Sequence, residues 1–438
     1  MDDQFRRKEF DAIVVGAGAG GATVARELTR RGRRVLVLER GANIFLRDSM
    51  ATMLRVLRAV PVGGGMTTLT AQTTGGSTGV YAAIAEMPHL DYFQSLGMDL
   101  SKELEQVRTE LPIATLPDEL MGPQTLRVRE SAIECGHDWK KRLMIIDQPK
   151  CRAGYSYEAK WNARVFLQSV GANGGTILPR ATVLKVIVEG NKAVGVEYTL
   201  GRANDGRDIH RAYGAKIVLS AGSVATPILL RKSGIKNIGD RGFYCDPCLT
   251  VFATVHGLKG TDCFTGTMGT EYVDDVSCGD ANFSRPLYRL FMLGNRRFRR
   301  LLAHSRTLGV GVVTKDDFGG RLREDGRCDK SLTDADRQRL NKGEALAAKI
   351  LRKAGGTDLF TSGLGAACVG GLIRMQTHFD KSFETEYRNL HVCDASVIPQ
   401  HIRSAPTITL ICLAKYLATK LSSFAQDDNR TEKSVAMR

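Results

Sequence analysis

Short hydrophobic runs alternate with amphipathic stretches near the start of the chain. Residues 13–15 (IVV) and 35–38 (VLVL) are uninterrupted apolar runs, as in strands buried on both faces of a parallel sheet. Between them, Val24 and Leu28 recur on one face of a helix predicted over residues 22–31. The pattern therefore predicts a strand–helix–strand unit and an α/β fold.

Further along, the chain mixes the periodicities of strands and helices. Residues 181–188 and 193–200 alternate apolar and polar side chains around a Gly-Asn turn, which predicts a β-hairpin. Residues 216–221 resemble another buried strand, and a helix is expected to begin near Thr226 after a Gly-Ser turn. This second strand–turn–helix unit also directs backbone N–H groups toward a ligand.

Two long helices are predicted in the last third of the chain. Thr333 and Asp336 have the spacing of a capping box at the start of the first. The second is expected to begin at Pro406 and to end near Ser423. The polar tail over residues 426–438 is expected to be disordered.

Glycine is concentrated directly after the first predicted strand. Gly16, Gly18 and Gly21 form a G-x-G-x-x-G motif between strand and helix. Glycine at these places permits a tight turn, close approach of the backbone to a pyrophosphate, and close packing of helix on sheet. Glu39 follows the second strand, 18 residues after Gly21, where a carboxylate can bind adenosine ribose hydroxyls. The unit predicts a dinucleotide site, with a glycine-rich turn of another α/β domain as the alternative.

The composition is that of a globular protein of two or three domains. The chain has 438 residues, of which 43% are hydrophobic, and it contains no apolar run long enough for a membrane span. Residues 5–10 loosely resemble a twin-arginine export signal, but the apolar stretch after them is the nucleotide-binding strand, so a cytoplasmic location is expected. The ten cysteines include one unpaired C-x-x-C, at Cys245 and Cys248, so reduced thiols and no metal site are expected.

Basic residues outnumber acidic ones, which gives a formal net charge of +15. No nucleic-acid partner is expected, because no binding motif or aromatic-rich basic stripe accompanies the charge. Basic and apolar residues recur at helical spacing from Arg285 to Arg306. Such a basic amphipathic helix would dock an acidic protein partner or hold the protein peripherally at a membrane surface. An ordinary solvated helix face is the alternative.

Four stretches together resemble the glucose–methanol–choline (GMC) oxidoreductase family. They are the N-terminal glycine unit, TTGGSTGVY at 73–81, VLSAGSVATPILLRKSGI at 218–235, and LHVCDASVIPQHIRSAPTITLICLA at 390–414. Their order and spacing match the family over nearly the whole chain. The segment KCRAGYSYEAKWNARVF at 150–166 also resembles a compact bacterial branch of that family.

The resemblance implies an α/β fold in which a discontinuous, Rossmann-like FAD-binding domain carries a smaller α+β substrate domain with an antiparallel sheet. The FAD-binding domain would comprise residues 1–90, 160–240 and 358–425. The substrate domain would comprise residues 91–159 and 241–357.

The resemblance also implies FAD rather than NAD as the cofactor. The FAD would be non-covalent, because the loop at residues 75–81 lacks the histidine that tethers the flavin in some members. The residues expected to contact FAD are Gly16, Gly18, Gly21, Glu39, Gly75, Gly76, Ser77, Val80, Val183, Ala221, Gly222, Asp394, Ala395, Thr407 and Ile408.

Both positions at which the family usually carries its catalytic residues are substituted. Cys368 stands where the resemblance places a histidine, and Ala405 where it places histidine or asparagine. Alcohol oxidation needs a general base for the hydroxyl proton. His401, in the loop before the last helix, is the first candidate and His378 a weaker one; a surface or structural role is the alternative for each. Cys368 is either a hydrogen donor or a small buried residue.

Three functions are consistent with these observations. The first is an FAD-dependent dehydrogenase that passes a hydride from a hydroxyl-bearing carbon, in a small-molecule or lipid-like substrate, to flavin N5 and then to a non-oxygen acceptor. The second is a flavoprotein with altered chemistry, either double-bond reduction or a reaction that depends on Cys368. The third is an FAD-binding subunit of a larger assembly that oxidises no alcohol.

Overall fold

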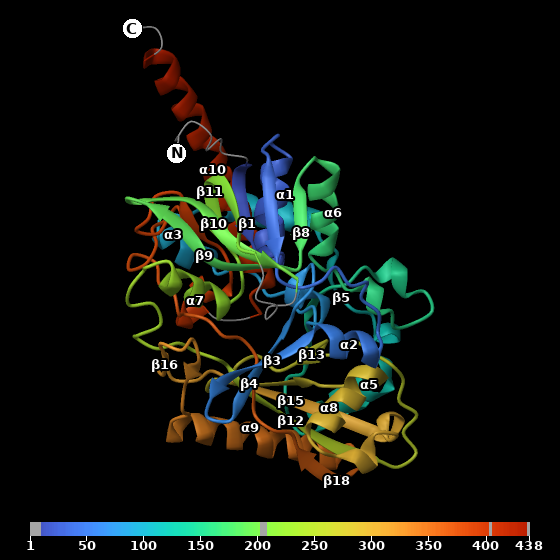
Figure 1. Cartoon of the computed structure of the whole chain (residues 1–438). Helices are drawn as coiled ribbons and strands as arrows, with labels where there is room; N and C mark the ends of the chain where they lie inside the picture. Colours follow the sequence, from blue (N-terminus) through green and yellow to red (C-terminus); the bar gives the residue numbers. More distant parts are fainter. Residues whose placement is uncertain (1–9, 202–207, 403–404, 436–438) are drawn as a thin grey trace.

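Two lobes, each built on its own β-sheet, make up the computed structural model (Figure 1). The structure describes residues 10–201, 208–402 and 405–435, with side chains described as far as residue 422. The chain passes between the lobes more than once, so each lobe is assembled from segments far apart in the sequence. No helix among these residues is long and apolar enough to cross a bilayer.

The sheet of the first lobe is parallel at its centre. Strand β1 (Phe10–Val15) lies between β2 (Val35–Glu39) and β11 (His210–Leu219), and all three run in the same direction. These strands are the apolar runs of the sequence, and their burial on both faces explains why they lack alternation. The sheet is completed by β8 (Thr176–Pro179), β9 (Ala181–Glu189), β10 (Lys192–Leu200) and β20 (Leu390–Val392).

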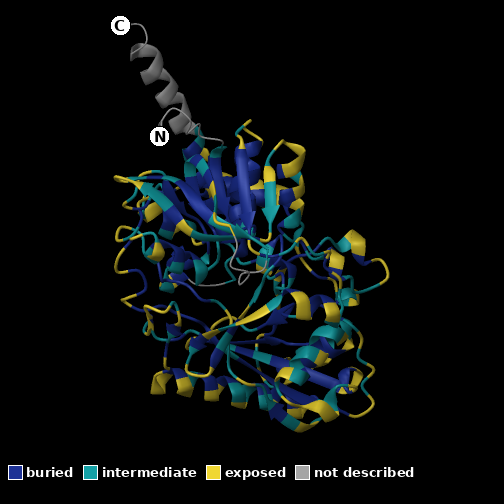
Figure 2. Cartoon of the chain, in the orientation of Figure 1, coloured by how far each residue is buried: buried dark blue, intermediate teal, exposed yellow. Residues whose placement is uncertain are grey.

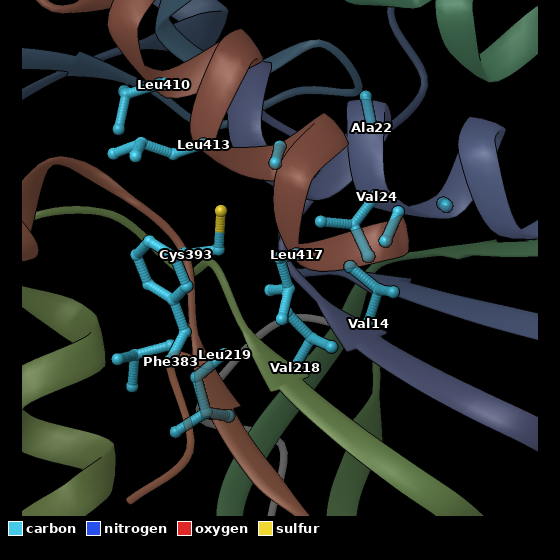
Figure 3. Packing of buried hydrophobic residues seen from close by; sticks show 14 of the residues in the cluster. Val14, Ala22, Val24, Val218, Leu219, Phe383, Cys393, Leu410, Leu413 and Leu417 are labelled. Carbon is cyan, nitrogen blue, oxygen red and sulfur yellow. The ribbon is translucent and has the colours of Figure 1, made fainter. Parts of the chain in front are cut away.

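Helix α1 (Ala19–Thr29) and helix α10 (Thr407–Val435) pack on each other beside this sheet. Val24 of α1, Leu417 of α10 and Val218 of β11 are buried together (Figure 3). Burial of each such side chain stabilises the fold by about 1.5–3 kcal/mol. The other helices of this lobe are α3 (Leu90–Ser95), α4 (Ser101–Glu110), α6 (Arg164–Ala172) and α7 (Ala225–Lys232).

The sheet of the second lobe is mainly antiparallel. Its central strand β12 (Pro247–Val255) pairs with β15 (Thr307–Thr314) on one side and with β18 (Gly356–Thr361) and β19 (Gly365–Ala366) on the other. The remaining strands are β3 (Leu57–Gly63), β4 (Met66–Ala71), β6 (Lys140–Lys141), β13 (Met268–Gly269) and β14 (Val276–Asp280). Two short two-stranded sheets contain β5 (Ile113–Thr115) with β7 (Leu143–Ile145), and β16 (Arg321–Leu322) with β17 (Cys328–Asp329).

Helix α9 (Asp334–Lys353) lies along this second sheet. The predicted capping box is confirmed: the Asp336 N–H donates to Thr333 Oγ1 at 3.1 Å, and the Thr333 N–H donates to Asp336 Oδ2 at 2.8 Å. Its inner residues, Ala347 and Ile350 among them, are buried, and its outer face is exposed (Figure 2). The lobe also contains α2 (Met50–Val56), α5 (Gly122–Glu134) and α8 (Arg285–Gly294).

The predicted hairpin and the predicted start of the last helix are confirmed by β9, β10 and α10. The predicted end of that helix near Ser423 is wrong, because α10 continues to Val435. No glycine or proline occurs between Ser423 and Val435 to end the helix. Residues 426–435, which were expected to be disordered, are therefore helical. Residues 436–438 lie outside the described residues.

The packing divides the chain differently from the expected domain boundaries at three places. Strands β18 and β19 belong to the second sheet, although residues from 358 onward are expected in the FAD-binding domain. Strands β3 and β4 belong to the second sheet, although residues 1–90 were assigned to the FAD-binding domain. Helix α4, expected in the substrate domain, instead contributes Leu104 and Val107 to the core of the first lobe and packs against α10. Sequence periodicity shows that these segments have an apolar face but not which sheet covers it.

Candidate functional site

The glycine turn after β1 shows why each glycine is needed. A Cβ at Gly16 would lie 2.2 Å from Ser220 O, and one at Gly21 would lie 2.0 Å from Gly16 O. Gly16 also has a φ of 102°, a region that favours glycine. A Cβ at Gly18 would meet no atom of the described residues within 4 Å. Gly16 and Gly21 therefore let the chain pack closely, whereas Gly18 borders open space.

The loop at Gly75 and Gly76 lies against the same turn. The Gly75 N–H donates to Ala17 O at 3.0 Å, and a Cβ on Gly76 would be 3.0 Å from Gly18 Cα. Helix α1 has no side-chain cap at its N-cap, Gly18, so no side chain occupies its first N–H groups. We call the backbone of Gly18, Gly75 and Gly76 the glycine cradle. Its open space and free helix N-terminus fit the pyrophosphate of a dinucleotide.

Glu39 stands at the end of β2, beside the glycine cradle. Its Oε2 accepts the Ala17 N–H at 3.0 Å and its Oε1 accepts the Gly41 N–H at 2.6 Å. Burial raises the pKa of this carboxyl, and the two backbone N–H donors oppose that rise. Each carboxylate oxygen has a second lone pair, so the fixed carboxylate can still accept a ribose hydroxyl.

Asp394 joins the C-terminal segment to the second glycine turn. Its Oδ2 accepts the Gly222 N–H at 2.9 Å, and its Oδ1 accepts the Ser396 N–H at 2.9 Å. The Thr226 hydroxyl donates to Oδ2 as well and accepts the Ala221 N–H at 2.9 Å. The carboxylate of Asp394 is thus bonded within the protein, and it places Ala221 and Gly222 close to the C-terminal segment.

The other residues expected at FAD are distributed over the first lobe and the loop that joins the lobes. Ser77 lies in a 3-10 turn, Gly76–Gly79, that ends at Val80, and Val183 lies half-buried in β9, opposite Tyr198. Ala395 follows Asp394 in a short 3-10 turn, Ala395–Val397. Thr407 and Ile408 are the first residues of α10, and both are buried.

Cys368 follows β19 of the second lobe and is half-buried. Burial raises the pKa of its thiol well above the ordinary value, and the negative charges of Asp246 and Glu86 raise it further. The adjacent Ala367 N–H donates to Asp246 O at 2.9 Å. The thiol therefore stays protonated at neutral pH, and so it is unable to act as a base.

Glu86 is a functional candidate that the sequence analysis did not identify. Its Oε2 accepts the N–H of Ala405, one of the two positions where the family resemblance leads us to expect a catalytic residue, at 3.1 Å. The charge of Glu86 acts on Cys368 and also on Tyr272, whose pKa is raised first by burial of its hydroxyl and then by Asp246 and Glu86. We call Glu86, Asp246, Tyr272 and Cys368 the Cys368 cluster. The signal in the sequence is one acid among small and apolar residues just after the loop at residues 75–81, which we call the flavin loop.

The two candidate histidines lie in different surroundings. His401 is exposed, and its ring meets the Tyr92 ring edge-on with 4.4 Å between centroids. Partial burial and neighbouring His89 lower the pKa of His401. Both ring nitrogens of His378 have partners: Nδ1 accepts the Arg374 N–H at 3.0 Å, and Nε2 lies 3.2 Å from Asn237 O. His378 therefore has a structural role, while His401 is open to solvent.

An apolar cavity of about 310 Å³ lies between α3, α10 and the segments around residues 371–383 and 397–400. Phe318, Phe379 and Phe383 supply aromatic lining, and Arg374 and Gln400 supply polar groups. Tyr92, the ring neighbour of His401, also lines it. The cavity thus has the composition of a site for an apolar ligand with one polar end.

The expected amphipathic helix over residues 285–306 is not continuous. Helix α8 ends at Gly294, Arg296 has a φ of 56°, and two 3-10 turns, Phe298–Arg300 and His304–Arg306, follow. The left-handed conformation breaks the helix after a glycine. Phe298 and Leu302 remain 62% and 83% exposed, so the segment still presents apolar and basic side chains together.

Among the residues that the structure describes, no group of three or more His, Cys, Asp or Glu could hold a metal ion. Cys245 of the C-x-x-C pair lies with its Sγ 3.5 Å from Asp316 Oδ2. Burial and the charge of Asp316 raise the pKa of this thiol, so it serves as a donor in the core.

Comparison with known proteins agrees with this geometry. A family model described as GMC oxidoreductase matches residues 10–242. An uncharacterized GMC-type oxidoreductase of Mycobacterium tuberculosis is 31% identical over 51% of this chain, and the match covers 39% of that relative's length. A long-chain-alcohol oxidase of Arabidopsis thaliana is 22% identical, over 94% of this chain and 67% of its own. The solved structure of an Aspergillus oryzae formate oxidase variant, which concerns FAD modification, aligns with a TM-score of 0.72 at 15% identity, over 95% of this chain and 99% of its own.

The match to the family model spans more than half of the sequence and includes the glycine cradle. The chain therefore belongs to the GMC oxidoreductase family.

Proposed function

We propose that the protein is an FAD-dependent oxidoreductase that oxidises a hydroxyl-bearing carbon and passes the electrons to an acceptor other than oxygen. The observation that carries the proposal is the glycine cradle, in which two glycine segments meet at the uncapped start of α1. Members of the GMC family use FAD, and such a cradle suits its pyrophosphate.

Residues around the cradle would hold the remaining parts of FAD. Glu39 would accept the ribose hydroxyls, and the backbone of Val183 would lie beside the adenine. The first turn of α10, at Thr407 and Ile408, would direct its N–H groups at the flavin edge, where a helix N-terminus favours negative charge. When bound, the flavin supplies a two-electron acceptor for a hydride.

We propose further that FAD is held without a covalent bond. Residues 75–81 contain no histidine, cysteine or other nucleophile that usually tethers a flavin, apart from Tyr81. The Tyr81 hydroxyl donates to Trp161 O at 2.8 Å, and burial raises its pKa, so it remains a protonated structural donor.

The substrate that the structure favours is a lipid-like alcohol. The apolar cavity lies beside the loop that carries His401, and its few polar groups stand at Arg374 and Gln400. One relative that aligns over most of this chain is named a long-chain-alcohol oxidase, which supports an apolar substrate with one hydroxyl.

Cys368 favours a second candidate, a flavoprotein of altered chemistry. A thiol that is kept protonated, in part by the charge of Glu86, is suited to donate hydrogen rather than to accept a proton. A third candidate is a non-catalytic subunit that docks through residues 285–306, supported by the exposed Phe298 and Leu302.

Turnover of the FAD-loaded protein with a series of primary alcohols and an artificial electron acceptor tests the proposal. Rates that rise with alkyl chain length support a lipid-like alcohol as substrate. Protein that retains FAD but turns over no alcohol with any acceptor would reject alcohol oxidation and favour one of the other candidates.

A further inference from the structure

Glu86 is fixed at the junction of the two lobes. The preceding Ala85 is buried, and its N–H donates to Leu143 O at 2.8 Å, while Ile84 forms a β-bridge with Met144. The backbone that leads into Glu86 is therefore held by residues 143 and 144. Glu86 itself is half-buried and follows the flavin loop by only a few residues.

One oxygen of this carboxylate is used to hold it in place, and the other is available. Oε2 accepts the Ala405 N–H at 3.1 Å, directly before Pro406 and the first turn of α10. Proline has no N–H, so Ala405 supplies the donor immediately before the helix. The positive end of the helix dipole favours a negative charge at this place. Oε1 makes no hydrogen bond to any residue within the described part of the chain.

Two side chains of the second lobe are affected by the charge of Glu86. Its charge reaches the Cys368 thiol and the Tyr272 hydroxyl, and Asp246 is the other acid that acts on both. Both the thiol and the phenol have raised pKa values, so neither is a base at neutral pH. Asp246 is 3% exposed, which leaves it less accessible than the half-buried Glu86.

We infer that Glu86 is the proton acceptor that replaces the missing catalytic pair, in place of His401. This inference rests on the proposed function. The hydroxyl O–H bond of the alcohol breaks and its proton goes to Glu86 Oε1. The C–H bond would break with its electron pair, for which bound FAD would supply the two-electron acceptor, and the carbon would be left as a carbonyl. The His401 ring meets the Tyr92 ring edge-on and is open to solvent, and His401 then has no part in the proton transfer.

The first experiment measures turnover of an alcohol by FAD-loaded Glu86→Gln, His401→Ala and Glu105→Gln. Glutamine keeps an oxygen for the Ala405 N–H but is not a base, so kcat of Glu86→Gln should fall by about two to four orders of magnitude with FAD content and Tm unchanged. Glu105 is an exposed acid of α4, and its variant is the matched control. In Glu86→Ala, added formate should restore turnover in proportion to its concentration, which a purely structural residue would not allow.

The second experiment needs no turnover. The rate at which iodoacetamide alkylates Cys368 is followed against pH by peptide mass spectrometry of the loaded protein. Glu86→Gln should lower the apparent pKa of this thiol, because a neighbouring negative charge is removed, and Asp246→Asn should do the same.

Wild-type turnover that persists in Glu86→Gln and disappears in His401→Ala would overturn the inference and leave the proposed function intact. An unchanged alkylation profile in Glu86→Gln, or loss of fold or of FAD in that variant, would also overturn it, since Glu86 would then be remote or structural. A wild type that oxidises no alcohol would reject the proposed function, and the inference with it.

Discussion

The glycine cradle and the Cys368 cluster lie in one molecule but depend on the sequence in different ways. The cradle is made of backbone, and the residues that shape it are glycines whose absent side chains can be read from a local motif. The Cys368 cluster is made of side chains brought together from distant segments, and a carboxylate at Glu86 can stand in for a residue lost at Ala405. Cofactor binding is therefore visible in the sequence, whereas the proton acceptor is visible only in the fold.

The largest effect is expected from a side chain at Gly21. In Gly21→Val the new Cβ would lie 2.0 Å from Gly16 O, a backbone atom that cannot move aside, so α1 must separate from the sheet. The free energy of unfolding should fall by about 1–3 kcal/mol or more, with loss of bound flavin. Thermal unfolding and flavin absorbance measure both. The control is Gly171→Ala in α6, where a Cβ meets no described atom within 4 Å, and this variant should keep its stability and its bound flavin. A Gly21→Val protein of normal stability would contradict the close packing of α1 on the sheet.

A smaller and more selective effect is expected at Gly18. Within the part of the chain that the structure describes, a Cβ there touches no atom within 4 Å, so Gly18→Ala should keep the Tm of the protein without FAD. The methyl group would occupy the space of the pyrophosphate, and loss of one charged hydrogen bond, about 1.5–3 kcal/mol, corresponds to roughly a 10- to 150-fold weaker FAD affinity. Titration of the deflavinated variant with FAD measures this. Unchanged affinity would place the pyrophosphate elsewhere.

Much of the first lobe could be predicted from the sequence because its signals are local. The apolar runs and the glycine triplet each act within a few residues, and each appears in the structure. The capping box at Thr333, in the second lobe, is an equally local signal and is also present. The bond between Glu86 and Ala405 joins residues 319 positions apart, and no periodicity indicates such a contact. The break after Gly294 was likewise missed, because apolar spacing continued through a residue whose backbone leaves the helical region.

The pH dependence of the Cys368 thiol tests the Cys368 cluster. Its raised pKa means that thiolate forms only at higher pH than for an ordinary cysteine, whose pKa is about 8.5. Alkylation of Cys368 should therefore be slow at pH 8 and still rise above pH 9, with Cys368→Ser as the blank. A plateau below pH 8 would show that the thiol is an activated nucleophile and that the charges of Glu86 and Asp246 do not reach it.

The smallest effect concerns residues 285–306, which we expect to bind anionic membranes or an acidic partner. Arg300 is paired with Asp358, and Arg297 lies over the Phe360 ring, so Arg296 and Arg299 are the better positions to change. Each arginine near an anionic surface contributes about 1 kcal/mol, so the double glutamine variant should bind acidic vesicles more weakly. Binding should also fall as salt approaches 1 M, where the Debye length is about 3 Å.

Co-sedimentation with vesicles measures this binding, and Arg108→Gln, an exposed arginine on α4 of the other lobe, is the matched control. Binding that is insensitive to salt, or equal in the two variants, would reject residues 285–306 as the docking surface.

The measurement that tests the account most directly is the identification of the flavin in the purified protein. We predict a yellow protein that releases FAD, and neither FMN nor NAD, into the supernatant after acid precipitation. We propose the cradle and Glu39 as the site of its dinucleotide part, and residues 75–81 offer no histidine for a covalent link. Glu39→Ala should retain less FAD than the wild type. A colourless protein that binds NAD in titration, or flavin fluorescence that stays with the denatured chain, would contradict the account.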